Sequence, residues 1–254
     1  MRTPRVPFVV VAGLLVLPAA ASGCGCQGDS SGPKPKPTTT AAAQPAPKGS
    51  ATIQGTARFS GTVPPPEAWG GATNADCKSK HEATIQLVKV QDGKLEDAFV
   101  YVKEGLPPGS YDVPKEKVSL DQKNCEFVPR VFGVVASQDI EAGNSDAFMH
   151  NVKSAEFNQG FPSAGVKRVL NLNEEKLMSV IQCDVHPWMR AYAGVMSHPY
   201  FAVTKADGAF TISGLTDGTY TVAAWHEKLG QVEVKAVKAS AAEPGKAELT
   251  FAAK

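Results

Sequence analysis

The chain has 254 residues, enough for one large domain or two modest ones, and carries 26 Lys and Arg against 25 Asp and Glu. Its net charge of +1, with no basic cluster interleaved with aromatic residues, excludes nucleic acid as the expected partner. Cys, His and Met are scarce, at five residues each, so a short segment holding all three needs a chemical explanation.

Residues 1–23 have the organisation of a signal peptide. Two Arg in "MRTPR" precede the apolar run "VPFVVVAGLLVLP", which is too short for a permanent membrane span, and the small residues of "AAASGC" follow. The letters "ASGC" resemble a bacterial lipoprotein box, which implies lipidation of Cys24 and anchoring to a membrane. Ordinary signal cleavage after Ala21 is the alternative. Either way we expect export to the periplasm or cell envelope, an oxidising compartment.

Residues 24–50 have the composition of a disordered tether. The stretch "QGDSSGPKPKPTTTAAAQPAPKG" is rich in Pro, Ala, Thr and Ser and contains no large apolar residue, so it cannot bury a core. Fully extended at ~3.1 Å per residue, it reaches roughly 70 Å. An anchored domain on such a tether would sweep out a volume in which to meet partners.

The rest of the chain predicts an all-β fold. Residues 51–61, "ATIQGTARFSG", alternate apolar and polar side chains, and residues 95–105, "LEDAFVYVKEG", are rich in β-formers. Asp-Gly pairs that begin at Asp92, Asp207 and Asp217 predict hairpin turns. Further short strands are predicted in "GAFTISGL", "GTYTVAAWHE", "VEVKAV" and "AELTF", and no long helical periodicity is found.

Two segments of residues 115–198 carry metal chemistry. "CDVHPWM" places the thiol of Cys183, the imidazole of His186 and the thioether of Met189 at intervals of three residues. Such soft and borderline donors suit copper better than calcium, magnesium or manganese. "NSDAFMHNV" supplies a further imidazole at His150, 33 positions before Cys183. A site with two His, one Cys and a weak Met ligand is typical of blue-copper electron-transfer centres.

The two segments together resemble the cupredoxin family, which includes plastocyanin, pseudoazurin and amicyanin. The resemblance rests on His150-Asn151-Val152, on the Cys-x2-His-Pro-x-Met loop and on "CEFVPRVFGV", while "ASQDIEAG" is more polar than the family's usual strand. It implies a Greek-key β-sandwich over residues 115–198, with Asn151 holding the two ligand loops together and Pro187 limiting loop motion. The implied ligands of one type 1 copper ion are His150, Cys183, His186 and Met189. It also implies that His186 presents the exposed edge through which electrons pass.

Other interpretations of Cys183 are a buried small apolar residue, a thiol nucleophile, half of a disulfide, or a ligand of structural zinc. Thioether is a poor zinc ligand, and the four ligand types occur in the right order, so copper is favoured. If Cys24 carries lipid and Cys183 binds copper as a thiolate, elimination leaves Cys77 and Cys125 as the disulfide candidate, with Cys26 left over.

The flanking residues resemble a second family. "DGAFTISGLTDGTYTVAAWHEKLG" is similar to the carboxypeptidase regulatory-like domain, a small Ig-like β-sandwich, whose opening strands match "IQGTARFSG" and "FVYVKEG". These pieces lie on both sides of the copper segment. We therefore expect a discontinuous sandwich of residues 51–114 plus 199–254, interrupted by the copper-binding domain at 115–198. Three consecutive pieces, the first incomplete, are the alternative.

Four further aromatic residues have two interpretations each. His81, His198 and His226 either form a second metal site or are ordinary exposed or hydrogen-bonded histidines, which is the commoner case. Trp188 is either part of a docking or electron-accepting surface or a packed aromatic that shields the metal. The sequence alone does not separate these interpretations.

The predicted function is electron transfer by an exported type 1 copper protein. We expect a monomer, an unidentified redox partner protein, and no enzymatic chemistry, because no nucleophile–base pair, second copper cluster or haem motif occurs. One alternative is a copper carrier or storage protein, which would lose its metal readily. The other is a cell-surface binding module in which copper is incidental.

Overall fold

The computed structural model describes residues 44–253, in which nearly all regular structure is β-strand. The all-β prediction is therefore confirmed. The predicted signal peptide, the lipidation site Cys24 and most of the tether lie outside the described residues. In the part of the chain that is described, no helix is long and apolar enough to cross a membrane.

The first sandwich contains strands from both ends of the chain. One sheet has the order β17-β1-β5-β4, with β20 also pairing with β1, and the other has the order β16-β6-β18-β19. The strands are β1 (Ala51–Ser60), β4 (Val90–Gln91), β5 (Lys94–Leu95), β6 (Phe99–Glu104), β16 (Phe201–Val203), β17 (Ala209–Leu215), β18 (Gly218–His226), β19 (Gly230–Ala239) and β20 (Gly245–Ala252). Alternate apolar side chains from both sheets meet in one core that includes Ile53, Val100 and Tyr220.

The second sandwich is built from the middle of the chain. Its sheets have the orders β13-β10-β7-β8 and β12-β11-β14-β15-β9. The strands are β7 (Val118–Lys123), β8 (Glu126–Val128), β9 (Val131–Val135), β10 (Ile140–Asn144), β11 (His150–Lys153), β12 (Asn158–Phe161), β13 (Lys167–Leu170), β14 (Lys176–Gln182) and β15 (Arg190–Met196). Its core includes Leu120, Phe161 and Ile181.

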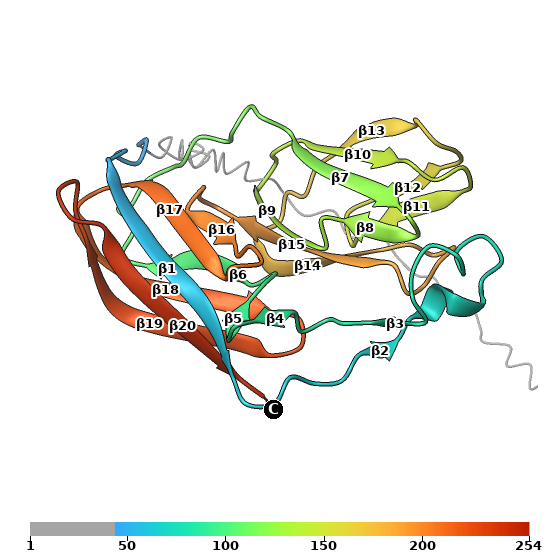
Figure 1. Ribbon diagram of the computed structural model, residues 1–254. Coiled ribbons are helices and arrows are strands. Elements are labelled where there is room, and N and C mark those ends of the chain that lie inside the picture. Colours follow the sequence, from blue (N-terminus) through green and yellow to red (C-terminus); the bar gives the residue numbers. More distant parts are fainter. Residues whose placement is uncertain (1–43, 254) are drawn as a thin grey trace, which may run out of the picture. The chain divides into compact units, whose positions relative to one another are not determined.

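Strand pairing keeps the two groups apart. Each of the strands named above pairs only within its own group, and the groups change between β6 and β7 and again between β15 and β16. Figure 1 shows the middle of the chain, in green to orange, forming a sandwich beside the one that strands from the two ends build together. Along the chain the strands therefore belong to the first sandwich, then to the second, and then to the first again.

The two sandwiches share an apolar junction. Phe99 and Tyr101 on β6 cluster with Val131 and Met196 of the second sandwich. Gly194 makes room for this contact, because a Cβ there would lie 2.3 Å from the Phe99 ring. The junction is therefore packed at van der Waals distance and has no space for an additional methyl group.

A long connection between β1 and β4 leaves the first sandwich and reaches the second, as Figure 1 shows in cyan and teal. We call residues 67–85 the strap. It contains β2 (Glu67–Ala68), the short 3₁₀ helix η1 (Gly70–Thr73) and β3 (Thr84–Ile85), which pairs with β2. The predicted disulfide between Cys77 and Cys125 is present and ties the strap to the turn between β7 and β8.

The last residues of the predicted tether lie against the first sandwich. The backbone N–H of Ala46 donates to the carbonyl of Ser110 at 2.8 Å, and that of Gly49 donates to Gly214 at 3.1 Å. Regular backbone hydrogen bonding thus begins several residues before Ala51.

Candidate metal centre

Three of the predicted ligands converge at one end of the second sandwich. His150 begins β11 and Cys183 directly follows β14, and these strands are antiparallel neighbours joined at Lys153 and Gln182. The Cys183 sulfur lies 4.0 Å from Nδ1 of His150 and 3.9 Å from Nδ1 of His186. The two Nδ1 atoms are 2.8 Å apart. The strand register thus brings residues that are 33 positions apart in sequence to one point.

The donor atoms fit a soft metal ion. His150, Cys183 and His186 are 0 %, 2 % and 4 % exposed. Burial lowers the pKa of His150, and burial together with the neighbouring His150 lowers the pKa of His186. Both imidazoles are therefore favoured in the neutral form that offers a lone pair to a metal. Two neutral imidazoles and a cysteine sulfur at one buried position match the donor set that copper prefers.

Met189 lies on the same loop as Cys183 and is 1 % exposed, in the same apolar cluster. Its N–H donates to the carbonyl of His186 at 2.9 Å, and its carbonyl accepts from the N–H of Cys183 at 3.3 Å. These bonds close the loop on itself, so the three predicted ligands that it carries are held by one short hydrogen-bonded turn. Pro187, between His186 and Trp188, is exposed at the outside of that turn.

Asn151 connects the two ligand segments. Its side-chain oxygen accepts from the N–H of Asp184 at 2.6 Å, and its side-chain nitrogen donates to Asn158 at 2.8 Å. The N–H groups of Asn151 and His186 point at the Cys183 sulfur at 3.5 and 3.3 Å. Such N–H donors stabilise a thiolate and tune the properties of a metal that it binds.

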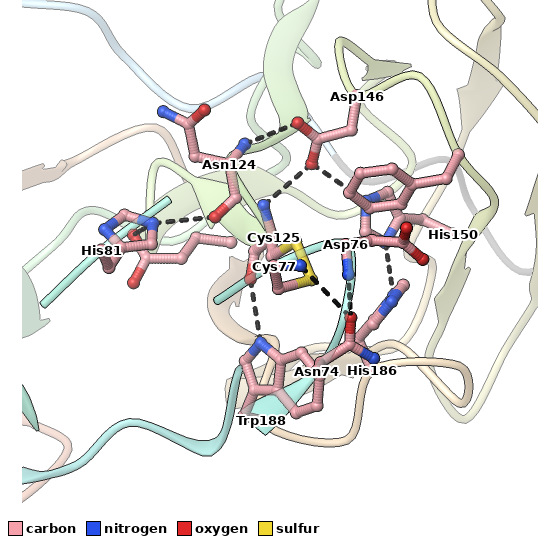
Figure 2. The surroundings of a disulfide bond; sticks show 12 residues. Asn74, Asp76, Cys77, His81, Asn124, Cys125, Asp146, His150, His186 and Trp188 are labelled. Carbon is pink, nitrogen blue, oxygen red and sulfur yellow. Dashed lines mark hydrogen bonds and ion pairs between the residues drawn. A yellow bond between two sulfur atoms is a disulfide. The ribbon is translucent and has the colours of Figure 1, made fainter. Parts of the chain in front are cut away.

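Asp146 is a functional residue that the sequence analysis missed. Its Oδ2 lies 3.0 Å from Nε2 of His150, which places the imidazole proton on Nε2 and leaves Nδ1 free to face Cys183. The carboxylate also accepts from the N–H groups of Asn124 and Cys125, at 2.9 and 2.8 Å (Figure 2). Burial acts to raise the pKa of Asp146, but these hydrogen bonds outweigh it and lower that pKa.

The strap covers the site, which corrects one expectation. His186 was expected to present an exposed edge, but it is 4 % exposed. The Trp188 ring lies 5.2 Å from the His186 ring, and Trp69 of the strap lies 6.1 Å from Trp188. Trp188 donates its Nε1–H to the carbonyl of Cys125 at 3.2 Å. Trp188 is therefore a packed aromatic that shields the site, held in place next to the disulfide (Figure 2).

The other histidines each make a hydrogen bond to the backbone through one ring nitrogen, while Nε2 of His226 is buried without a partner. Nδ1 of His198 accepts from the N–H of Tyr200, and Nδ1 of His226 accepts from the N–H of Lys228. Nε2 of His81 donates to the carbonyl of Asn124 at 2.8 Å. Within residues 44–253, no group of three potential metal-binding side chains includes any of these histidines.

Comparisons with known proteins find distantly similar solved structures. No family model matches the chain, and no curated protein matches it. A purple cupredoxin from Nitrosopumilus maritimus is 17% identical and covers 31% of this chain and 98% of its own, with a TM-score of 0.28. An amicyanin from Paracoccus versutus is 18% identical over 38% of this chain and 96% of its own, with a TM-score of 0.29. A copper-containing nitrite reductase from Thermus scotoductus is 17% identical over 37% of this chain and 25% of its own, with a TM-score of 0.28.

Proposed function

We propose that this protein binds one copper ion in a type 1 site and carries electrons in the cell envelope. The observation that supports this most directly is the buried convergence of two imidazole Nδ1 atoms and one thiol within 4.8 Å of one another. His150, Cys183 and His186 would hold the ion, with Met189 as a weak fourth ligand. Bound copper would supply a one-electron couple.

The chain's own contribution is to keep these ligands still. Asn151 joins the two ligand segments, backbone hydrogen bonds close the loop from Cys183 to Met189, and Asp146 orients His150. Ligands that are fixed from outside move little when the metal changes its charge. Small movement favours fast electron transfer, because little reorganisation is needed.

Burial weighs against the alternatives. A carrier has to deliver its metal to another protein, but here every predicted ligand is at most 4 % exposed and a disulfide pins the covering strap. Substrate chemistry at the metal would need an open position, so we propose that the protein is not an enzyme. Location in an oxidising compartment, lipidation at Cys24, a monomeric state and a redox partner protein belong to the same proposal. The disulfide supports the compartment.

The test is the visible absorption and electron paramagnetic resonance of the full chain with added Cu(II). We expect an intense blue or green band and narrow copper hyperfine splitting, both lost in Cys183→Ser. Cys24→Ser serves as the matched control, since it removes a cysteine that is not a predicted copper ligand. A pale spectrum that Cys183→Ser leaves unchanged would contradict the type 1 assignment.

A further inference from the structure

We propose that electrons reach and leave the metal through a series of rings in edge-to-face contact: His186, Trp188, Trp69 and His81. The outer end of this series lies at an acidic groove, which receives a cationic redox partner. This inference rests on the proposed function and adds the route and the kind of partner. One electron passes between the partner and copper, converting Cu(II) to Cu(I) or the reverse. No bond is made or broken, and no proton moves.

The route is needed because the ligands do not reach the surface. His150, Cys183, His186 and Met189 are at most 4 % exposed. An electron must therefore tunnel through covering side chains, and tunnelling is faster through packed atoms than across gaps.

The rings form a continuous packed series. Ring centroids are 5.2 Å apart for His186 and Trp188, 6.1 Å for Trp188 and Trp69, and 4.8 Å for Trp69 and His81, each pair in an edge-to-face arrangement. Contacts of this kind are favourable packing geometries for aromatic rings. The series starts at a metal ligand and ends at His81, whose side chain is 30% exposed.

Covalent and hydrogen bonds keep the series in place. Trp188 is held by its bond to the carbonyl of Cys125, and His81 by its bond to the carbonyl of Asn124. Cys125 is itself joined to Cys77 of the strap. Figure 2 shows His186, Trp188 and His81 arranged around the disulfide. The strap is therefore fixed at the points where its rings meet the second sandwich.

The outer end of the series borders a groove with an excess of negative charge. Trp69 and His81 both line this groove, which has a volume of about 630 Å³. Its charged lining residues are Glu82, Glu96, Asp97 and Glu126 against Lys89 and Arg130. Lys89 is paired with Asp97 at 2.9 Å, and Arg130 with Glu227, which lies outside the groove. Such a surface attracts a positively charged partner and repels an anionic one.

The opposite cover of the site offers the competing route. Phe148 contacts the rings of both His150 and His186, at 5.1 and 5.8 Å. Met149 and Val185, next to the two histidines in sequence, are 51% and 47% exposed. This face is apolar, so it would not distinguish cations from anions, and the charge preference of the reaction separates the two routes.

The experiment is stopped-flow reduction of the copper-loaded full chain by two small reductants, the dication hexaammineruthenium(II) and the dianion iron(II)–EDTA. We expect added salt to slow the reaction with the dication and to speed that with the dianion. The double variant Glu82→Gln with Glu126→Gln should weaken both effects.

The series of rings is tested by replacing Trp69. Trp69→Leu removes the ring and should slow reduction by the dication several-fold, while Trp69→Phe retains a ring and should keep most of the reduction rate. The visible spectrum and the reduction potential should stay unchanged in both variants. The matched control is Met149→Gln on the opposite face, which should leave the rate unaltered. Should Trp69→Leu prove unstable, a ruthenium photosensitiser bound to His81 in the wild type and in Trp69→Met, which fills more of the space but has no ring, measures the same route, since the other four histidines are buried; transfer should be slower in Trp69→Met.

Equal rates in the wild type and Trp69→Leu, or a slower reaction in Met149→Gln instead, would overturn the route while leaving the type 1 copper site intact. Absence of the type 1 spectrum in the wild type would instead refute the proposed function itself. The two failures are therefore distinguishable.

Discussion

Asp146 fixes the orientation and tautomer of His150, and it shows how one carboxylate prepares a metal ligand. Its two oxygens accept from the N–H groups of Asn124 and Cys125 and from Nε2 of His150. A ligand histidine held by a carboxylate is a stronger and better oriented donor, and loss of such a partner typically costs 10–100-fold in metal affinity.

Asp146→Asn is therefore expected to weaken copper binding by roughly 10–100-fold. Both oxygens of Asp146 accept hydrogen bonds, but the Asn side chain has only one accepting oxygen. Its NH₂ group would therefore face an N–H donor. Competition with a chelator of known affinity measures the change. Asp121→Asn is the control, because this neighbouring carboxylate accepts from the exposed Ser145 hydroxyl. Equal affinities in the wild type and Asp146→Asn would show that Asp146 has no role in orienting the ligand.

His226 predicts a pH dependence of folding. It is fully buried, and burial lowers its pKa from the ordinary value of 6.5. Below pH 6.5 the unfolded chain therefore binds a proton at His226 that the folded chain does not bind. The stability that neutral His226 contributes is complete above pH 6.5 and is lost as the pH falls below that value. Urea unfolding of the metal-free chain between about pH 8 and pH 5 should show this loss.

The matched variant is His226→Asn, whose side-chain oxygen can still accept from the N–H of Lys228. It should reduce the fall in unfolding free energy at low pH, although the other buried histidines with lowered pKa values, His150, His186 and His198, keep part of that fall. An unchanged pH dependence would mean that His226 takes up no extra proton on unfolding.

For single residues of the site, the sequence predicts local chemistry better than it predicts long-range contacts. His150, Cys183 and His186 could be named because their spacing and neighbours form recognisable motifs, and the structure brings the three together. Asp146 stands inside the same quoted segment, but its meaning depends on Asn124 and Cys125, which precede it by about twenty positions. Only a fold in space shows that contact.

Among the secondary-structure elements, those of the strap were the hardest to predict from the sequence. Its strands β2 and β3 have two residues each and its helix η1 has four, so no periodicity in the sequence predicts them. The long strands of both sandwiches, in contrast, were visible from alternation and Asp-Gly turns. The expectation of an exposed His186 was wrong because the element that covers it comes more than a hundred residues earlier. Only the disulfide between Cys77 and Cys125, inferred by elimination, pointed to that contact.

Removing the disulfide should destabilise the protein substantially. Cys77 and Cys125 are 48 residues apart, and closing a loop of that size is worth about 4 kcal/mol in the chain-entropy model. The double variant Cys77→Ala with Cys125→Ala should lower the free energy of unfolding in guanidinium by about 2–4 kcal/mol. Reduced wild-type protein should behave like the variant. A loss well below this range would show that the strap is held by its packing alone.

On the scale of the whole molecule, the question is whether the two sandwiches fold as one unit. Residues 51–104 and 201–252 pair their strands together, and residues 118–196 pair theirs separately. Several contacts join the two groups, among them the junction around Phe99, the strap, and the ion pair between Arg130 and Glu227. Contacts of this extent favour cooperative folding over independent opening of the two sandwiches.

The ion pair offers the sharpest test of that cooperativity. Arg130 of the second sandwich donates from Nε and a terminal nitrogen to both oxygens of Glu227, at 2.5 and 2.9 Å, and the two side chains are 21% and 6% exposed. Breaking a largely buried pair leaves one charge without its partner, so Glu227→Gln should cost on the order of 3 kcal/mol. In the double variant Glu227→Gln with Arg130→Met no charge is left uncompensated, so much of that loss should be recovered.

Hydrogen exchange resolves where the loss appears. Amides of β18 report the first sandwich and those of β14 the second. If the junction makes one cooperative unit, Glu227→Gln lowers the protection of the slowest amides in both strands by the same free energy. Lys103→Gln is the control, because its pair with Glu233 is more exposed and lies within the first sandwich. Loss of protection in β18 alone would mean that the sandwiches open independently, and the second sandwich would then keep its ligand geometry without support from the first.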